Sequence, residues 1–111
     1  MLEKIYYEII FNNSKNDFNN FISCMLKKIF KNNNDISYDV QYSKQVGYES
    51  CDVCFLINKN IVNISFLKTN NKKILAVPTK RQKQENANSF LSSIIDNIKT
   101  LYKCKITKNS L

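Results

Sequence analysis

The sequence has no histidine and no tryptophan, and it holds only one glycine and one proline. Without an imidazole, the chain cannot build a Ser-His or Cys-His nucleophile pair, nor a zinc site with histidine ligands. Arg81 is the only arginine. This scarcity counts against base-specific or phosphate-clamping recognition, because bidentate contacts prefer the guanidinium group. These absences favour a protein that is not an enzyme.

Long apolar runs are also missing. No stretch approaches the roughly 20 apolar residues that a membrane-spanning helix needs. The first residues, MLEKIYYEII, carry charges inside their apolar segment, unlike a signal peptide. We expect a cytoplasmic protein, and peripheral binding at a membrane is the only membrane association left open.

What the chain does have is a balanced core composition and an excess of lysine. At 111 residues with 43% hydrophobic residues, it is expected to form one domain over residues 1–111. The net charge of +8 points to nucleic acid or an anionic membrane as a partner. However, abundant Asn, Lys and Ile beside scarce Arg, Gly and Pro are typical of an AT-rich coding sequence. The charge therefore indicates solubility first and an acidic partner second.

Two kinds of periodicity predict the fold. Apolar residues at alternate positions, or in short apolar runs, predict strands at 4–11, 35–42, 51–57, 61–68 and 73–79. Steps of three and four residues predict a helix over 17–31 and another from Phe90 to Tyr102. We read 43–50 as a loop around the only glycine, Gly47, and 82–88 as a polar segment.

Each predicted helix has one apolar stripe that needs a surface to cover. The stripes consist of Phe18, Phe21, Ile22, Met25, Leu26 and Ile29, and of Phe90, Leu91, Ile94, Ile95, Ile98, Leu101 and Tyr102. Short turns between successive strands favour antiparallel neighbours. The expected fold is therefore α+β, in the order β-α-β-β-β-β-α, with an antiparallel sheet and both helices packed on one face.

Cysteine supplies the sharpest short motif, because Cys51 and Cys54 form a C-x-x-C pair. A zinc ribbon would need a second close pair, which Cys24 and Cys104 do not provide. A redox motif should open a helix, whereas this pair lies in a predicted strand, where residues three apart point to opposite faces. We interpret these cysteines as apolar strand residues, with metal and redox roles as the alternatives.

Other reactive groups are sparse. Asp35, Asp39, Glu49 and Asp52 are near one another in sequence, but no spacing implies acid/base work, so we read them as solvated. Tyrosines interleave with lysines in KIYYEI and VQYSKQVGY. Base stacking is one interpretation, but core and cross-strand packing is the usual role of inward tyrosines. We expect no cofactor and no metal.

Basic residues gather in two places. The segment Lys80, Arg81, Gln82 and Lys83 separates the last predicted strand from the last helix, and Lys27, Lys28 and Lys31 fall on the polar side of the first helix. Together they would attract anionic headgroups, with each nearby Lys or Arg worth about 1 kcal/mol. A solvated loop is the alternative.

Four segments of the sequence carry a family resemblance: KIYYEIIF, NDFNNFISCMLKKIF, NISFLKTNNKKILAVPTKR and NSFLSSIIDNIKTL. In their order, they resemble the kinase-associated C-terminal domain found at the end of the microtubule-affinity-regulating kinases and of the α subunit of AMP-activated protein kinase. Lys80 and Arg81 stand where that family often has a basic pair. The same order of elements also resembles a half-repeat of the TATA-box-binding protein.

The resemblance implies a non-catalytic regulatory or interaction module. Such a module binds acidic phospholipid surfaces through its basic pair, restrains or localises an attached kinase domain, or assembles with a regulatory subunit. The alternative from composition is a small basic protein that associates with nucleic acid or the ribosome, with affinity that falls steeply with salt.

Overall fold

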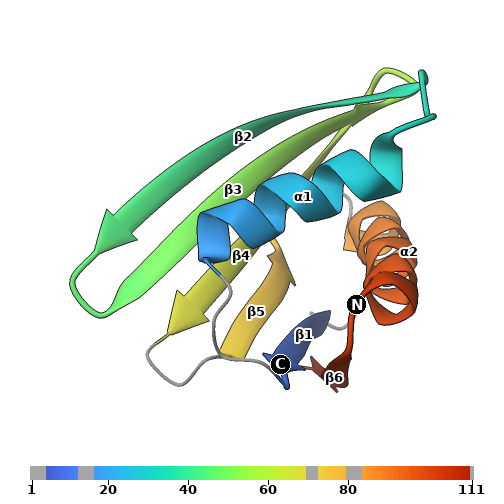
Figure 1. Cartoon of the computed structure of the whole chain (residues 1–111). Helices are drawn as coiled ribbons and strands as arrows, with labels where there is room; N and C mark the ends of the chain where they lie inside the picture. Colours follow the sequence, from blue (N-terminus) through green and yellow to red (C-terminus); the bar gives the residue numbers. More distant parts are fainter. Residues whose placement is uncertain (1–4, 13–16, 70–72, 80–83, 111) are drawn as a thin grey trace.

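The computed structural model describes residues 5–12, 17–69, 73–79 and 84–110, and it has the predicted α+β architecture (Figure 1). The elements in order are β1 (Ile5–Phe11), α1 (Phe18–Phe30), β2 (Ile36–Gln45), β3 (Tyr48–Ile57), β4 (Asn60–Thr69), β5 (Lys73–Pro78), α2 (Gln84–Leu101) and β6 (Cys104–Ser110). The strand β6 was not predicted from the sequence.

All strands belong to one six-stranded antiparallel sheet, in the order β2-β3-β4-β5-β1-β6. The strands β2, β3, β4 and β5 follow one another as a meander. The first strand then pairs with β5 on one side and with β6 on the other, so both ends of the described chain lie at the same side of the sheet (Figure 1).

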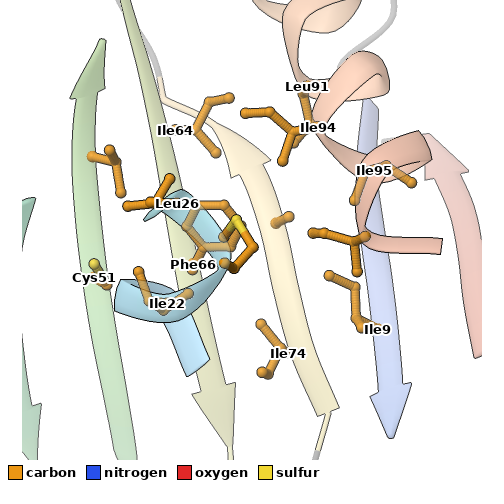
Figure 2. Close-up of a cluster of buried hydrophobic side chains, with 14 of the residues drawn as sticks. Ile9, Ile22, Leu26, Cys51, Ile64, Phe66, Ile74, Leu91, Ile94 and Ile95 are labelled. Carbon is orange, nitrogen blue, oxygen red and sulfur yellow. The ribbon is translucent and has the colours of Figure 1, made fainter. Parts of the chain in front are cut away.

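Both helices lie on one face of the sheet, which we call the covered face, and the opposite face is the open face (Figure 1). Helix α1 packs against β3, and α2 packs against β4, β5 and β6. Figure 2 shows Phe66 beneath Ile22 and Leu26 of α1, and Ile64 facing Leu91 of α2. The residues buried in this layer are all apolar, and no buried polar or charged residue is found among those described.

The predicted stripes are largely confirmed. Phe18, Phe21, Ile22, Met25 and Leu26 of α1 are buried, as are Leu91, Ile94, Ile95 and Ile98 of α2. Burying one such side chain contributes about 1.5–3 kcal/mol, so these helices are held by packing more than by their own propensity. Leu101 is the exception, because it lies at the end of α2 and is 44% exposed.

Asp17 caps the N-terminus of α1. The Asp17 carboxylate accepts a hydrogen bond from the backbone N–H of Asn19 at 3.1 Å. The Asp17 carbonyl also accepts from the N–H of Phe21 at 2.9 Å, which closes the first turn. Aspartate suits this position because the first helical N–H groups have no partner within the helix.

The loop predicted over residues 43–50 is wrong. Strands β2 and β3 continue through it, with Gln45 paired to Tyr48, so that only Val46 and Gly47 form the turn. Gly47 has φ of +89°, a conformation that glycine adopts without strain, while Val46 at the tip is fully exposed. Side chains in this part of the hairpin point alternately to the two faces, but residues 43–48 are all exposed. The strands therefore continue without the alternation of apolar residues that would reveal them in the sequence.

The turn between β3 and β4 is where it was predicted. Asn58 and Lys59 both have positive φ, 48° and 69°, as a two-residue turn matching the twist of the flanking strands requires. The polar segment 82–88 was misread in part, because α2 begins at Gln84, ahead of its apolar stripe.

Candidate functional site

The lysines predicted on the first helix lie on its solvent side. Lys27, Lys28 and Lys31 are exposed at the C-terminal end of α1, where the helix dipole favours positive charge. Their side chains can therefore meet an external surface. Lys28 also has a partner, since its ammonium group lies 5.1 Å from the centre of the Tyr102 ring.

The Tyr102 ring joins the two helices. Tyr102 follows the last turn of α2 and packs edge-on against Phe21 of α1, with 5.2 Å between ring centres. Burial raises the pKa of the Tyr102 hydroxyl, and the nearby Cys24 thiol of α1 raises it further. The C-terminal end of α2 therefore lies beside Phe21, Cys24 and Lys28 of α1. By contrast, Phe30 at the end of α1 stacks on Phe90 near the start of α2, with 6.0 Å between ring centres.

This packing adds lysines that the sequence reasoning missed. Lys99 lies in the last turn of α2, and Lys103 follows Tyr102 directly. Burial raises the pKa of the Cys104 thiol, and the positive charge of Lys99 acts in the opposite direction, so Lys99 lies close to Cys104 at the start of β6. A lysine in the last turn of each helix was visible in the sequence, but the approach of Lys28 to the C-terminal end of α2 depends on helix packing.

We call the set Lys27, Lys28, Lys31, Lys99 and Lys103 the basic surface. All of its side chains are exposed. Within the described part of the chain, no carboxylate forms an ion pair with any of them. By contrast, Lys73 lies 3.6 Å from the Glu8 carboxylate on the open face. The basic surface thus carries positive charge that is not neutralised by the described residues.

The predicted site residues Lys80, Arg81 and Lys83 lie outside the described residues. Their contribution to an anion-binding surface stays a prediction.

The C-x-x-C pair is split between the two faces of β3. Cys51 is fully buried on the covered face, whereas Cys54 is half-buried on the open face. Burial raises the pKa of the Cys51 thiol to about 12, and the nearby Asp52 carboxylate adds to the shift. A thiol that stays protonated is a poor nucleophile and metal ligand. This geometry supports the interpretation of Cys51 as an apolar strand residue.

The remaining cysteines do not join that pair. All four cysteines are free thiols. Cys24 donates to the Asn20 side-chain oxygen at 3.6 Å, and Cys104 donates to the carbonyl of Tyr102 at 3.8 Å. Within residues 5–12, 17–69, 73–79 and 84–110, no three Cys, Asp or Glu side chains come together as metal ligands would.

The inward tyrosines are packing residues. Tyr7 is buried in the core, and Tyr38 lies beside Phe30 and Phe55 with ring centres 5.9 and 6.2 Å away. Tyr42 is 39% exposed, but its hydroxyl donates to the Asn19 carbonyl of α1 at 3.4 Å. These rings are not displayed together as a platform for nucleobases, which would need free faces.

The hollows on the described surface include two shallow ones. One, of about 450 Å³, lies between the β3–β4 turn and α2, and none of its lining residues is titratable: Ile57, Asn58, Asn60, Val62, Asn86, Ser89, Phe90 and Ser93. The other, of about 390 Å³, lies on the open face beside Asp39 and Asp52. The Asp52 carboxylate accepts a hydrogen bond from Ser65 at 2.6 Å. Both aspartates are exposed, as predicted for solvated strand residues.

No relative was found whose functional site could be transferred to this chain. Protein-family models, curated proteins and solved structures contain no match to this chain. The resemblance to the kinase-associated domain, and that to the TATA-box-binding protein, therefore stay predictions. Among the residues that the structure describes, neither helix is long and apolar enough to cross a membrane.

Proposed function

We propose that this protein is a non-catalytic interaction module that binds anionic phospholipid surfaces through its basic surface. The observation that carries the proposal is the contact of Lys28 with the Tyr102 ring, which brings the polar side of α1 to the lysine-bearing C-terminal end of α2. In the described chain, none of these lysines forms an ion pair with a carboxylate. Near an anionic leaflet each lysine contributes about 1 kcal/mol, so the set would give reversible, salt-sensitive binding.

The family resemblance supports the same proposal and extends it. In the resemblance, Lys80 and Arg81 correspond to the family's basic pair, and Lys83 lies close to them in the sequence. If these three residues also bind anionic headgroups, they would add to this attraction. A domain of that type would localise or restrain a kinase domain attached to it or bound by it. This extension rests on the resemblance alone, whereas the lipid proposal also rests on the geometry of the basic surface.

Sedimentation with vesicles tests the proposal. Vesicles of phosphatidylcholine with and without phosphatidylserine would be mixed with the wild-type chain, with Lys27→Gln/Lys31→Gln/Lys103→Gln, and with Lys44→Gln/Lys105→Gln/Lys108→Gln. Each variant loses the same charge from exposed lysines, but only the first changes the basic surface. Lys28 is left in place because it contacts Tyr102.

We expect the wild type and the second variant to bind phosphatidylserine vesicles, and the first variant to bind at least tenfold more weakly. Equal binding to neutral vesicles, or equal loss in both variants, would reject a localised lipid site. The nucleic-acid alternative makes a different prediction, because it requires RNA or DNA binding at physiological ionic strength that weakens steeply with salt.

A further inference from the structure

The two edges of the sheet differ in how well they are protected. In the described chain, β2 pairs only with β3, and β6 pairs only with β1. An edge strand leaves a row of backbone N–H and C=O groups on its outer side, where another strand can pair. Proteins usually blunt such an edge with charged residues, especially lysine.

The β6 edge follows this rule more closely than the β2 edge. Strand β6 spans seven residues and carries Lys105 and Lys108, with Lys103 just before it. Strand β2 spans ten residues and carries two residues of opposite charge, Asp39 and Lys44. The β2 edge is therefore long, has no net charge and is open to strand pairing.

The core also continues up to this edge. On the covered face, Val40 lies opposite Val53 and Tyr38 lies opposite Phe55. The β3 residues of these pairs are 1% and 0% exposed, whereas their β2 neighbours are only partly buried. An additional strand alongside β2 would cover the apolar surface that β2 leaves half-exposed.

We propose that β2 pairs antiparallel with β2 of a second copy of this chain, with the two-fold axis at Val40. Residues that face each other across this axis then come from the same face of the sheet, as strand pairing requires. Tyr38 lies opposite the partner's Tyr42, and Asp39 lies opposite the partner's Gln41. Ser37 lies opposite the partner's Ser43, so no like charges meet.

The alternative registers are less favourable. An axis at Asp39 sets that carboxylate against the partner's Asp39, and like charges directly opposite each other destabilise a strand pair. An axis at Gln41 replaces the pair between Tyr38 and the partner's Tyr42 with a pair between Tyr38 and the partner's Lys44. In the Val40 register, the strand can therefore pair with a second copy of itself without opposing like charges.

This dimer has a consequence for the helices. Side-by-side strand pairing places the two-fold axis perpendicular to the sheet, so the covered faces of both copies point the same way. The two basic surfaces would then meet one flat surface together, which increases binding through a higher effective concentration. The dimer itself does not depend on lipid binding.

The test uses paired substitutions at Ser37 and Ser43, both exposed residues on the open side of β2. In Ser37→Lys/Ser43→Lys, each new lysine faces a lysine of the partner in the Val40 register. In Ser37→Lys/Ser43→Glu, each lysine faces a glutamate of the partner. The two positions lie six residues apart, about 20 Å along a strand, so within one chain the new charges barely interact.

Analytical ultracentrifugation of the full chain, from low micromolar to near-millimolar concentration in low salt, measures the dimer. Circular dichroism confirms that each variant is folded. We expect wild-type dimers, with the Lys/Glu variant dimerising roughly tenfold more tightly than the Lys/Lys variant, from two cross-strand pairs per dimer. The difference should shrink at high salt.

Three results would overturn the proposal. The wild type could stay monomeric at every concentration, in which case the β2 edge has no second copy as its partner. Both variants could dimerise like the wild type, in which case another surface is responsible. Finally, Lys105→Glu/Lys108→Glu could change the dimer more than the Ser37 and Ser43 variants do, which would assign the contact to β6.

Discussion

The two faces of the sheet have the same strands but different chemistry. On the covered face, the described residues pack into one apolar layer under α1 and α2. The open face is mixed: Asp52 bonds to Ser65, Glu8 pairs with Lys73, and Ile61 is 60% exposed. Successive residues of a strand point to opposite faces. The residues of the covered face and those of the open face therefore alternate along each strand.

The comparison shows where the stability of the domain lies. Apolar side chains on the covered face lose contact with water and gain packing partners from the helices. Side chains on the open face keep much of their hydration, so their contacts contribute less. Residues of the open face and the sheet edges can therefore contact partners at little cost in stability, whereas residues of the covered face stabilise the fold.

The largest expected effect separates two isoleucines on the same strand. Ile64 of β4 is fully buried on the covered face, and Ile61 is 60% exposed on the open face. We expect Ile64→Ala to lower the free energy of unfolding by about 2–5 kcal/mol, through lost burial and a residual cavity. Ile61→Ala should cost no more than about 1 kcal/mol.

Urea titration of the wild type and both variants measures this contrast. Helix and strand content by circular dichroism serves as the control that each variant starts folded. Equal costs for the two substitutions would contradict the division of the sheet into a covered and an open face.

A smaller effect concerns pH. The Cys51 pKa is raised from its ordinary value of 9.0 to about 12, because burial disfavours the thiolate. The unfolded chain therefore loses this proton at lower pH than the folded chain. The contribution of Cys51 to stability is complete below pH 9 and is lost progressively as the pH rises toward 12.

Between pH 9 and 10, we expect this thiol to account for a loss of about 1 kcal/mol. Stability measured by urea titration across this range should fall less steeply in Cys51→Ala than in the wild type. Cys54→Ala is the matched control, because it retains the Cys51 thiol and should keep the wild-type slope. An identical slope in all three proteins would mean that Cys51 is not buried as a neutral group.

The sequence predicted the parts of the fold that bury residues. Alternation identified β1 and β4, and three- and four-residue steps identified α1 and the apolar part of α2. Each of these segments has one face in the core, and burial is what imposes a hydrophobic period. The α+β class and the antiparallel sheet followed from them.

The missed segments bury little. The β2–β3 extension around Gly47 is exposed on both faces, and β6 presents only Cys104 and Ile106 to the core. Their strand structure comes from backbone pairing with neighbours, such as Gln45 with Tyr48, and such pairing leaves no hydrophobic signature.

Only some residues of the candidate site could be predicted from the sequence, for a related reason. Lys27, Lys28 and Lys31 follow from the helical period of α1, because they fall opposite its apolar stripe. The C-terminal end of α2, which carries Lys99 and Lys103, lies beside Lys28 only because Tyr102 packs against α1. Contacts between residues so far apart in sequence depend on tertiary structure, which local periodicity does not encode.

The central claim is that α1 and α2 close over one face of the sheet, and Cys51 and Cys54 report on both faces from a single strand. Native protein would be exposed to iodoacetamide, digested, and analysed by fragment-ion mass spectrometry to measure the alkylation rate of each thiol. The account predicts that Cys54 reacts in the folded protein, while Cys51 is protected until the domain unfolds in urea. Alkylation of Cys51 as fast as that of Cys54 under native conditions would contradict it.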